Sequence, residues 1–162
     1  MFYYFLSFLI VIRIVELIIS RNNEKWLRSE GAIEYGREHY KFFIFFHTGF
    51  FITLILEYNL SPFSGIKYIP LFFFFIVQIF RLSIFKTLGK YWNTRILVIP
   101  GRNLVKKGLY RYLKHPNYII VIFEFILIPL SFSLLYSMII FSILNLILLS
   151  VRIKAENKAL GY

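Results

Sequence analysis

Residues 117–151 read NYIIVIFEFILIPLSFSLLYSMIIFSILNLILLSV, and this apolar block is too long for a single membrane-spanning helix. A helix that crosses the hydrocarbon core of a bilayer needs about 20 residues. Pro129 and the serines that follow it interrupt the block near its middle. The block therefore predicts a tight helical hairpin, whose arms cover residues 117–130 and 133–153 and whose first arm is short or tilted.

Three apolar runs earlier in the chain are each close to the length of a membrane span. They cover residues 2–20, 42–57 and 68–85. Together with the two arms of the hairpin, they give five helices. The chain is 59% hydrophobic, whereas soluble domains are nearer half apolar. The sequence therefore predicts an all-α fold, that of a polytopic membrane protein with about five transmembrane helices.

The basic residues indicate the orientation in the membrane. They gather in segments 21–41 and 86–114 and in the C-terminal tail, which five spans place on one side. Lysine and arginine are enriched in the cytoplasmic loops of membrane proteins. We therefore expect a multi-pass protein of the cell membrane, with its N-terminus outside and its C-terminus in the cytoplasm. The formal net charge of +11 fits contact with an anionic lipid bilayer, and we expect no nucleic-acid partner.

The segment 89–118 reads GKYWNTRILVIPGRNLVKKGLYRYLKHPNY and has no acidic residue. Tryptophan and tyrosines are interleaved with its basic residues, whereas disordered segments are poor in aromatics. We expect it to form a cytoplasmic cofactor pocket. A chain of this length is expected to be one unit. We therefore predict a single integral membrane domain over residues 1–162, with transmembrane helices in residues 1–85 and a catalytic core in residues 86–162.

Ionisable residues interrupt the apolar runs, where a charge is costly and usually faces the interior of the bundle. Arg13 and Glu16 are three residues apart on one helical face and are expected to pair with each other. Arg81 is expected to extend to the cytoplasmic surface. His47, alone in its span, is more typical of a hydrogen-bonded packing residue than of a ligand.

Asn145, Arg152 and Glu156 are spaced by seven and four residues, so they form one stripe along the last predicted helix. Glu124, in the preceding arm, is expected to face this stripe. Two interpretations stay open. Arg152 and Glu156 form an ion pair that serves stability alone, or they belong to a binding site on the same cytoplasmic side as segment 89–118.

Several classes of catalytic site have no support in the sequence. Cysteine is absent, which excludes disulfides, thiolate nucleophiles and cysteine-bound metals. The histidines at positions 39, 47 and 115 show no metal-ligand spacing, so we expect no metal site. The G-x-S-x-G, Walker and G-x-G-x-x-G patterns are also missing. What remains is a basic, aromatic pocket suited to an anionic or adenine-bearing ligand.

Three motifs stand out in the C-terminal half. They are the G-L-Y turn at Gly108–Tyr110, the H-P-x-Y box at His115–Tyr118, and an R-x-x-x-E pair at Arg152 and Glu156. With these motifs the chain resembles the isoprenylcysteine carboxyl methyltransferase family, and W-N-T-R-I at residues 92–96 resembles its short bacterial branch. Membrane phospholipid N-methyltransferases and sterol reductases carry similar boxes.

The resemblance implies a bacterial enzyme that uses S-adenosylmethionine. Arg152 would be the catalytic residue and would meet an acidic oxygen of the methyl acceptor. The chain departs from the family pattern at Ile119, where glycine is common, and at Asn157, which replaces a second glutamate. By the motif matches, the residues in contact with the cofactor would be Arg102, Asn103, Leu104, Val105, Tyr110, His115, Pro116, Asn117, Tyr118 and Glu156.

The expected methyl acceptor is a lipophilic small molecule that carries a carboxylate, enol or phenol. The short bacterial branch includes enzymes that methylate hydroxyls of long-chain polyketide pyrones, so the resemblance favours a long-chain polyketide. An acidic oxygen beside an arginine is readily anionic, and methyl transfer to it then depends mainly on proximity and orientation. Three alternatives remain: a phospholipid N-methyltransferase, an NADPH-dependent reductase of the same fold, and a non-enzymatic membrane scaffold.

Overall fold

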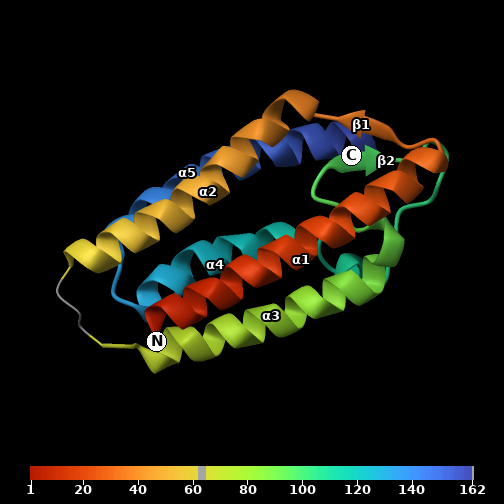
Figure 1. Cartoon of the computed structure of the whole chain (residues 1–162). Coiled ribbons are helices and arrows are strands. Elements are labelled where there is room, and N and C mark those ends of the chain that lie inside the picture. Colours follow the sequence, from red (N-terminus) through yellow and green to blue (C-terminus); the bar gives the residue numbers. More distant parts are fainter. Residues whose placement is uncertain (62–64, 162) are drawn as a thin grey trace.

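The computed structural model describes residues 1–61 and 65–161, and within them the chain forms five α-helices joined by short elements (Figure 1). A two-stranded antiparallel sheet pairs β1 (Ile33–Tyr35) with β2 (Ile96–Val98), and two 3-10 turns, η1 (Gly89–Tyr91) and η2 (Gly108–Arg111), follow α3. The predicted all-α fold is confirmed. The helices are α1 (Phe2–Ser29), α2 (Arg37–Leu60), α3 (Tyr68–Leu88), α4 (Pro116–Ser131) and α5 (Leu135–Leu160).

Among the described residues, four helices are long and apolar enough to cross a membrane: α1, α2, α3 and α5. The fifth apolar helix, α4, has 16 residues and is the short first arm that the sequence predicted. These helices agree with a polytopic membrane protein. Which side faces the cytoplasm stays a prediction, and the loop expected outside includes residues 62–64, which lie outside the described part of the chain.

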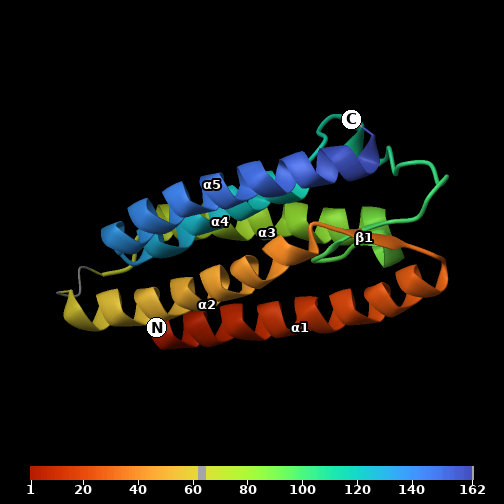
Figure 2. The ribbon, with the colours of Figure 1, turned by 90° about the horizontal axis from the view of Figure 1, so that it is seen from above.

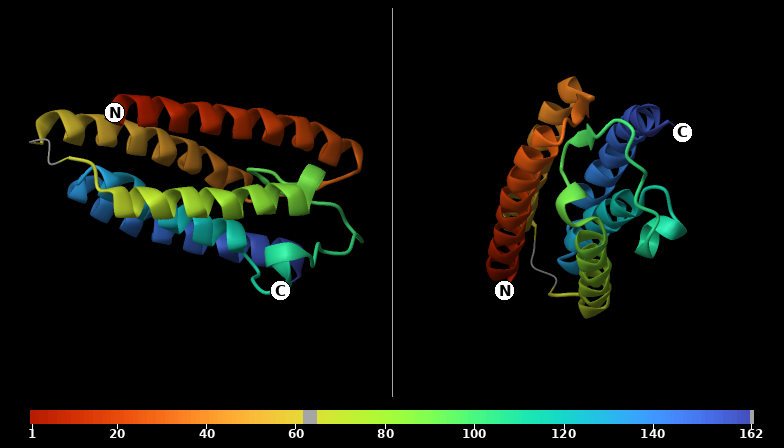
Figure 3. Two further views of the ribbon diagram at one scale, coloured as in Figure 1. Left: turned by 90° about the horizontal axis from the view of Figure 1, so that it is seen from below. Right: turned by 90° about the vertical axis from the view of Figure 1, so that its right-hand side faces the viewer.

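The five helices run alongside one another, and the short elements gather at one end of the bundle (Figures 1 and 2). This loop end consists of residues 30–36, residues 89–115 and the last turns of α5. The N-terminus lies toward the opposite end, while the C-terminus lies beside β2 (Figure 1). Figure 3 shows the same arrangement from two further sides. The loop end therefore brings together the predicted catalytic core and the C-terminal charged stripe.

Toward the N-terminal end, the bundle is held by packed aromatic rings. Phe50, Phe74, Phe125 and Phe141 are buried in one apolar cluster. The rings of Phe50 and Phe125 have their centroids 4.5 Å apart, and those of Phe50 and Phe141 are 5.2 Å apart. Packing of this kind is a main force between helices in a lipid environment, where the hydrophobic effect between them is weak.

Glu57, near the end of α2, fixes the start of α5. Its carboxylate accepts hydrogen bonds from the backbone N–H groups of Tyr136 and Ser137, at 2.9 and 2.7 Å. The first N–H groups of a helix have no partner within that helix. Glu57 therefore supplies from a neighbouring helix what a capping side chain usually supplies, and it ties the position of α5 to that of α2.

A buried ion cluster joins three helices in the middle of the bundle. Arg13 of α1 contacts Glu16 at 2.6 Å, which confirms the predicted pair, and it also contacts Glu124 of α4 at 2.6 Å. Arg81 of α3 contacts Glu16 at 2.7 Å and Glu124 at 2.5 Å. The Gln78 amide donates to Glu124 at 2.7 Å.

Two expectations about these residues were wrong. Arg81 does not extend to the surface: it is 4% exposed, because carboxylates from α1 and α4 both pair with it inside the bundle. Glu124 does not face the stripe on α5, because its carboxylate oxygens accept hydrogen bonds from Arg13, Arg81 and Gln78. Paired charges are tolerated inside a bundle, and an unpaired one is costly.

Candidate functional site

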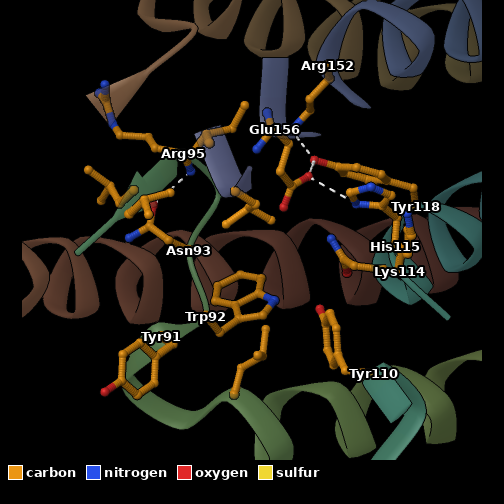
Figure 4. Close-up of a pocket in the computed structure, with 16 residues that line it drawn as sticks. Tyr91, Trp92, Asn93, Arg95, Tyr110, Lys114, His115, Tyr118, Arg152 and Glu156 are labelled. Carbon is orange, nitrogen blue, oxygen red and sulfur yellow. Dashed lines mark hydrogen bonds and ion pairs between the residues drawn. The ribbon is translucent and has the colours of Figure 1, made fainter. Parts of the chain in front are cut away.

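A polar cavity lies at the loop end, between the segment that follows α3, the start of α4 and the last turns of α5 (Figure 4). Segment 89–118 thus supplies most of its wall, as the sequence predicted for a pocket. The polar side chains and rings that line it include Tyr91, Trp92, Asn93, Arg95, Tyr110, Lys114, His115, Asn117, Tyr118, Arg152 and Glu156.

The H-P-x-Y box forms the start of α4. Pro116 occupies the first helical position, where its missing N–H costs nothing and its fixed φ favours the helix. His115 precedes it and Tyr118 lies within the first turn, so the two rings stack with their centroids 5.3 Å apart. The box therefore presents a histidine and a tyrosine side by side to the cavity.

Tyr118 links the two charged residues of α5. Its hydroxyl donates to the Glu156 carboxylate and accepts a hydrogen bond from Arg152 Nε at 3.0 Å. Arg152 Nη2 also donates to the carbonyl of Thr94 at 2.6 Å, and the guanidinium lies over the ring of Phe43 at 4.9 Å. The guanidinium is thus held by three elements at once, with its orientation fixed before any ligand binds.

His115 lies between Glu156 and Asn157 of α5, and Figure 4 shows its contact with Glu156. Its Nδ1 is 3.4 Å from Glu156, and its Nε2 is 2.8 Å from Oδ1 of Asn157. The hydrogen bond to Glu156 raises the pKa of the His115 imidazole above its ordinary value, and the contact with Asn157 acts in the same direction against partial burial. Asn157 was not among the predicted site residues, although its position directly after Glu156 was a signal for it.

Tyr110 reaches the cavity from η2. Gly108, at the start of this turn, has a φ of +54°, and a Cβ there would lie 2.7 Å from the Thr87 hydroxyl. Only glycine fits such a backbone without strain, which explains the G-L-Y motif. Burial raises the pKa of the Tyr110 phenol, with the charge of Glu156 adding to the effect, so this residue presents a neutral hydroxyl.

The W-N-T-R segment is anchored to α1. Ser20 Oγ contacts the Thr94 hydroxyl at 2.8 Å, and the Asn93 amide donates to the Ser20 carbonyl at 2.9 Å. Arg95 pairs with Glu34 at 2.5 Å and lies 4.2 Å from the ring of Tyr40. These contacts fix the Thr94 carbonyl that orients the Arg152 guanidinium, a role that the sequence did not reveal.

A second, apolar cavity of about 270 Å³ lies next to the polar one, among all five helices. Leu17, Phe43, Phe51, Val121 and Leu149 are among the apolar side chains that line it. The two cavities share part of their lining: Trp92, Asn93, Asn117, Tyr118 and Arg152. A ligand in the polar cavity and an apolar ligand in the second one would therefore meet at Arg152 and Tyr118.

The structure brings together six of the predicted site residues: Tyr110, His115, Asn117, Tyr118, Arg152 and Glu156. The others do not line the cavity. Pro116 is buried as the first residue of α4. Arg102 is exposed and binds Tyr91 and Glu30, and it begins a stretch, Arg102–Val105, without helix or strand. Contact of Arg102, Asn103, Leu104 and Val105 with a cofactor stays a prediction.

Comparison with known proteins places the chain among membrane methyltransferases. Residues 69–162 match the sequence model of the isoprenylcysteine carboxyl methyltransferase family. The chain is 48% identical to the uncharacterized protein YpbQ of Bacillus subtilis, over 99% of this chain and 96% of that protein. It is 28% identical to an uncharacterized protein of Haemophilus influenzae, over 95% and 91% of the two chains. No solved structure matches it.

Proposed function

Since the chain belongs to the isoprenylcysteine carboxyl methyltransferase family, we propose that it transfers a methyl group from S-adenosylmethionine to an acidic oxygen of a lipophilic acceptor. The acceptor oxygen is a carboxylate, enol or phenol, and a long-chain polyketide is the preferred class. The observation that carries this proposal is the wall shared by a polar and an apolar cavity, with Arg152 in it.

The residues of the polar cavity fit the cofactor. Glu156 is an acceptor for the ribose hydroxyls or the amine. The Tyr110 and Tyr118 rings are suited to the sulfonium, because aromatic faces attract cations. When bound, S-adenosylmethionine supplies an electrophilic methyl group. The predicted contacts are therefore chemically reasonable for those residues that line the cavity.

Arg152 is suited to orient the acceptor. Two of its nitrogens are engaged, by Tyr118 and by Thr94, and Nη1 has no hydrogen-bond partner within the described residues. A guanidinium favours the anionic form of a nearby acidic group. An acceptor oxygen that binds Nη1 would thus be held as an anion at the wall between the cavities, and orientation alone supplies much of the rate of such a displacement.

The apolar cavity is suited to the rest of the acceptor. Phe43, Phe51, Val121 and Leu149 offer contacts to an alkyl chain but no hydrogen bonds from their side chains. A ligand pocket of this kind, mostly apolar with few polar groups, binds lipophilic molecules and fixes their orientation through those polar groups. The bilayer around the helices is the proposed source of the acceptor.

Binding and transfer can be tested on the detergent-purified protein. Calorimetric titration with S-adenosylhomocysteine should show binding, and titration with NADPH should not. The reverse result would identify a reductase. Tritiated S-adenosylmethionine should then label a long-chain aryl carboxylic acid, meta-dodecyloxybenzoic acid. Labelling of phosphatidylethanolamine vesicles instead would identify a phospholipid N-methyltransferase. If neither nucleotide binds, the non-enzymatic membrane scaffold is the remaining alternative.

A further inference from the structure

The apolar cavity has a polar inner end. Arg13, Glu16, His47 and Arg81 all line it, and they lie within the helices rather than at the loop end. A cavity for an alkyl chain alone has no need of four polar side chains. Three of them belong to the buried ion cluster, and the fourth, His47, lies on α2 beside it.

The ion cluster at this inner end is balanced. Two arginines, Arg13 and Arg81, face two carboxylates, Glu16 and Glu124, and all four pairs are within 2.7 Å. A further full charge would disturb this balance. One donor is nevertheless unused: Arg81 Nε is buried and has no hydrogen-bond partner in the described part of the chain. A buried donor without a partner is costly, and a neutral oxygen at this place would remove that cost.

His47 adds an unused acceptor. Its Nδ1 is 2.8 Å from the carbonyl oxygen of Phe43. A carbonyl only accepts, so Nδ1 carries the hydrogen, and in the neutral ring Nε2 keeps a lone pair. The ring is held edge-on against Phe125, with centroids 5.4 Å apart. Within the described residues, Nε2 has no hydrogen-bond partner. The prediction that His47 packs through a hydrogen bond is confirmed, but one side of the ring is left for a ligand.

We propose that this inner end binds a second, neutral oxygen of the methyl acceptor, a hydroxyl or a carbonyl. A hydroxyl suits it best, because it can donate to His47 Nε2 while its oxygen stays available to a donor such as Arg81 Nε. This inference rests on the proposed function, since it concerns the molecule that Arg152 orients at the other end of the cavity.

The positions of Phe43 and His47 along α2 indicate the approximate spacing of the two oxygens. The Arg152 guanidinium lies over the ring of Phe43, and His47 is four residues further along the same helix. Four residues correspond to a rise of about 6 Å. The acceptor therefore carries an acidic oxygen and a neutral oxygen separated by roughly one helical turn, about 6 Å, a separation that two positions of one ring can provide.

The test is a pair of probes that differ by one hydroxyl. The first is meta-dodecyloxybenzoic acid, and the second is the same acid with a hydroxyl at its other meta position. Their dissociation constants are measured by calorimetry on the purified protein, with and without saturating S-adenosylhomocysteine. The wild type should bind the hydroxylated acid about fivefold to tenfold more tightly, as expected for one or two net hydrogen bonds.

Three variants separate ligand binding from a structural role. His47→Phe keeps a ring against Phe125 but removes Nε2, so it should abolish the preference for the hydroxylated acid, and the variant should bind the two acids with equal affinity. His47→Gln, which places an amide near Nε2, should restore much of the preference. Val121→Ala, on the apolar wall, should weaken both acids alike.

Equal affinity of the wild type for the two acids would overturn the inference, and so would a preference that survives in His47→Phe. Failure of the acids to bind at all would also overturn it. The proposed function fails on a different result, absence of S-adenosylhomocysteine binding. In that case the titrations without this nucleotide still decide whether the inner end holds an oxygen.

Discussion

Arg152 and Glu156 lie one turn apart on α5, but they meet through the hydroxyl of Tyr118 instead of through a direct ion pair. Each charge keeps a second partner of its own: the Thr94 carbonyl for Arg152, and His115 for Glu156. The two residues therefore face different surroundings, and the interpretation in which each only neutralises the other is not what the geometry shows.

Removing the shared hydroxyl should uncouple the two residues. We expect Tyr118→Phe to keep the fold, because the ring still packs in the first turn of α4. Arg152 loses one of its two hydrogen bonds, so methyl transfer should fall by at least about tenfold, as for a hydrogen bond to a charged group. The measurement is the initial rate with tritiated S-adenosylmethionine. Tyr112→Phe, at a side chain that is 79% exposed, is the matched control and should be fully active.

The raised pKa of His115 predicts a pH dependence of stability. A histidine whose pKa is higher in the folded state than in the unfolded state stabilises the fold below its unfolded pKa, about 6.5. This contribution is lost as the pH rises through the folded pKa. The melting temperature should therefore fall as the pH rises from about 6.5 through the folded-state pKa of His115. His115→Asn should remove this part of the fall. A melting profile that is the same in the variant and the wild type would contradict the role of the Glu156 contact.

The buried ion cluster should be sensitive to the loss of one carboxylate. Glu124→Gln leaves Arg13 and Arg81 facing one charge in place of two, and breaking a buried ion pair costs about 3 kcal/mol or more. Denaturant unfolding in detergent should show this loss. Glu30→Gln, which removes an exposed pair with Arg102, is the control and should change little. Equal stability of the two variants would mean that the cluster does not hold the helices together.

The membrane orientation can be tested with accessibility tags. Tags at the C-terminus and near Lys106 should both report the cytoplasm, and a tag within residues 61–67 should report the outside, because the basic loops partition that way. A cytoplasmic report from the 61–67 tag would refute the predicted topology and place the polar cavity on the wrong side for a cytoplasmic cofactor.

The sequence predicted the helices well because long apolar runs leave few alternatives to a membrane helix. It also predicted that the H-P-x-Y box and the R-x-x-x-E pair lie together at one end of the bundle, because each motif lies at the end of a recognisable helix. It failed where the outcome depends on which helices become neighbours. Arg81 was expected at the surface, but its partners Glu16 and Glu124 are 65 and 43 residues away. A periodicity within one helix carries no information about such contacts.

The roles of Ser20 and Thr94 were missed for the same reason. Ser20 and Thr94, which fix the carbonyl that orients Arg152, are 74 residues apart in the chain. The stretch Arg102–Val105 was assigned to the cofactor by motif; it does not line the cavity, Arg102 binds Glu30, and its contact with a cofactor stays a prediction. Polar residues such as these have many possible partners, so their roles depend on the tertiary structure.

The most direct test of the account is a calorimetric titration of S-adenosylhomocysteine into Arg152→Ala and Glu156→Ala, run beside a methylation assay. Arg152→Ala should keep nearly the wild-type affinity for the nucleotide and lose methyl transfer. Arg152→Lys should also be poorly active, because a point charge does not replace the guanidinium fork. Glu156→Ala should lose nucleotide affinity. Equal loss of affinity in both alanine variants, with equal thermal destabilisation, would contradict the division of labour and leave a purely structural pair.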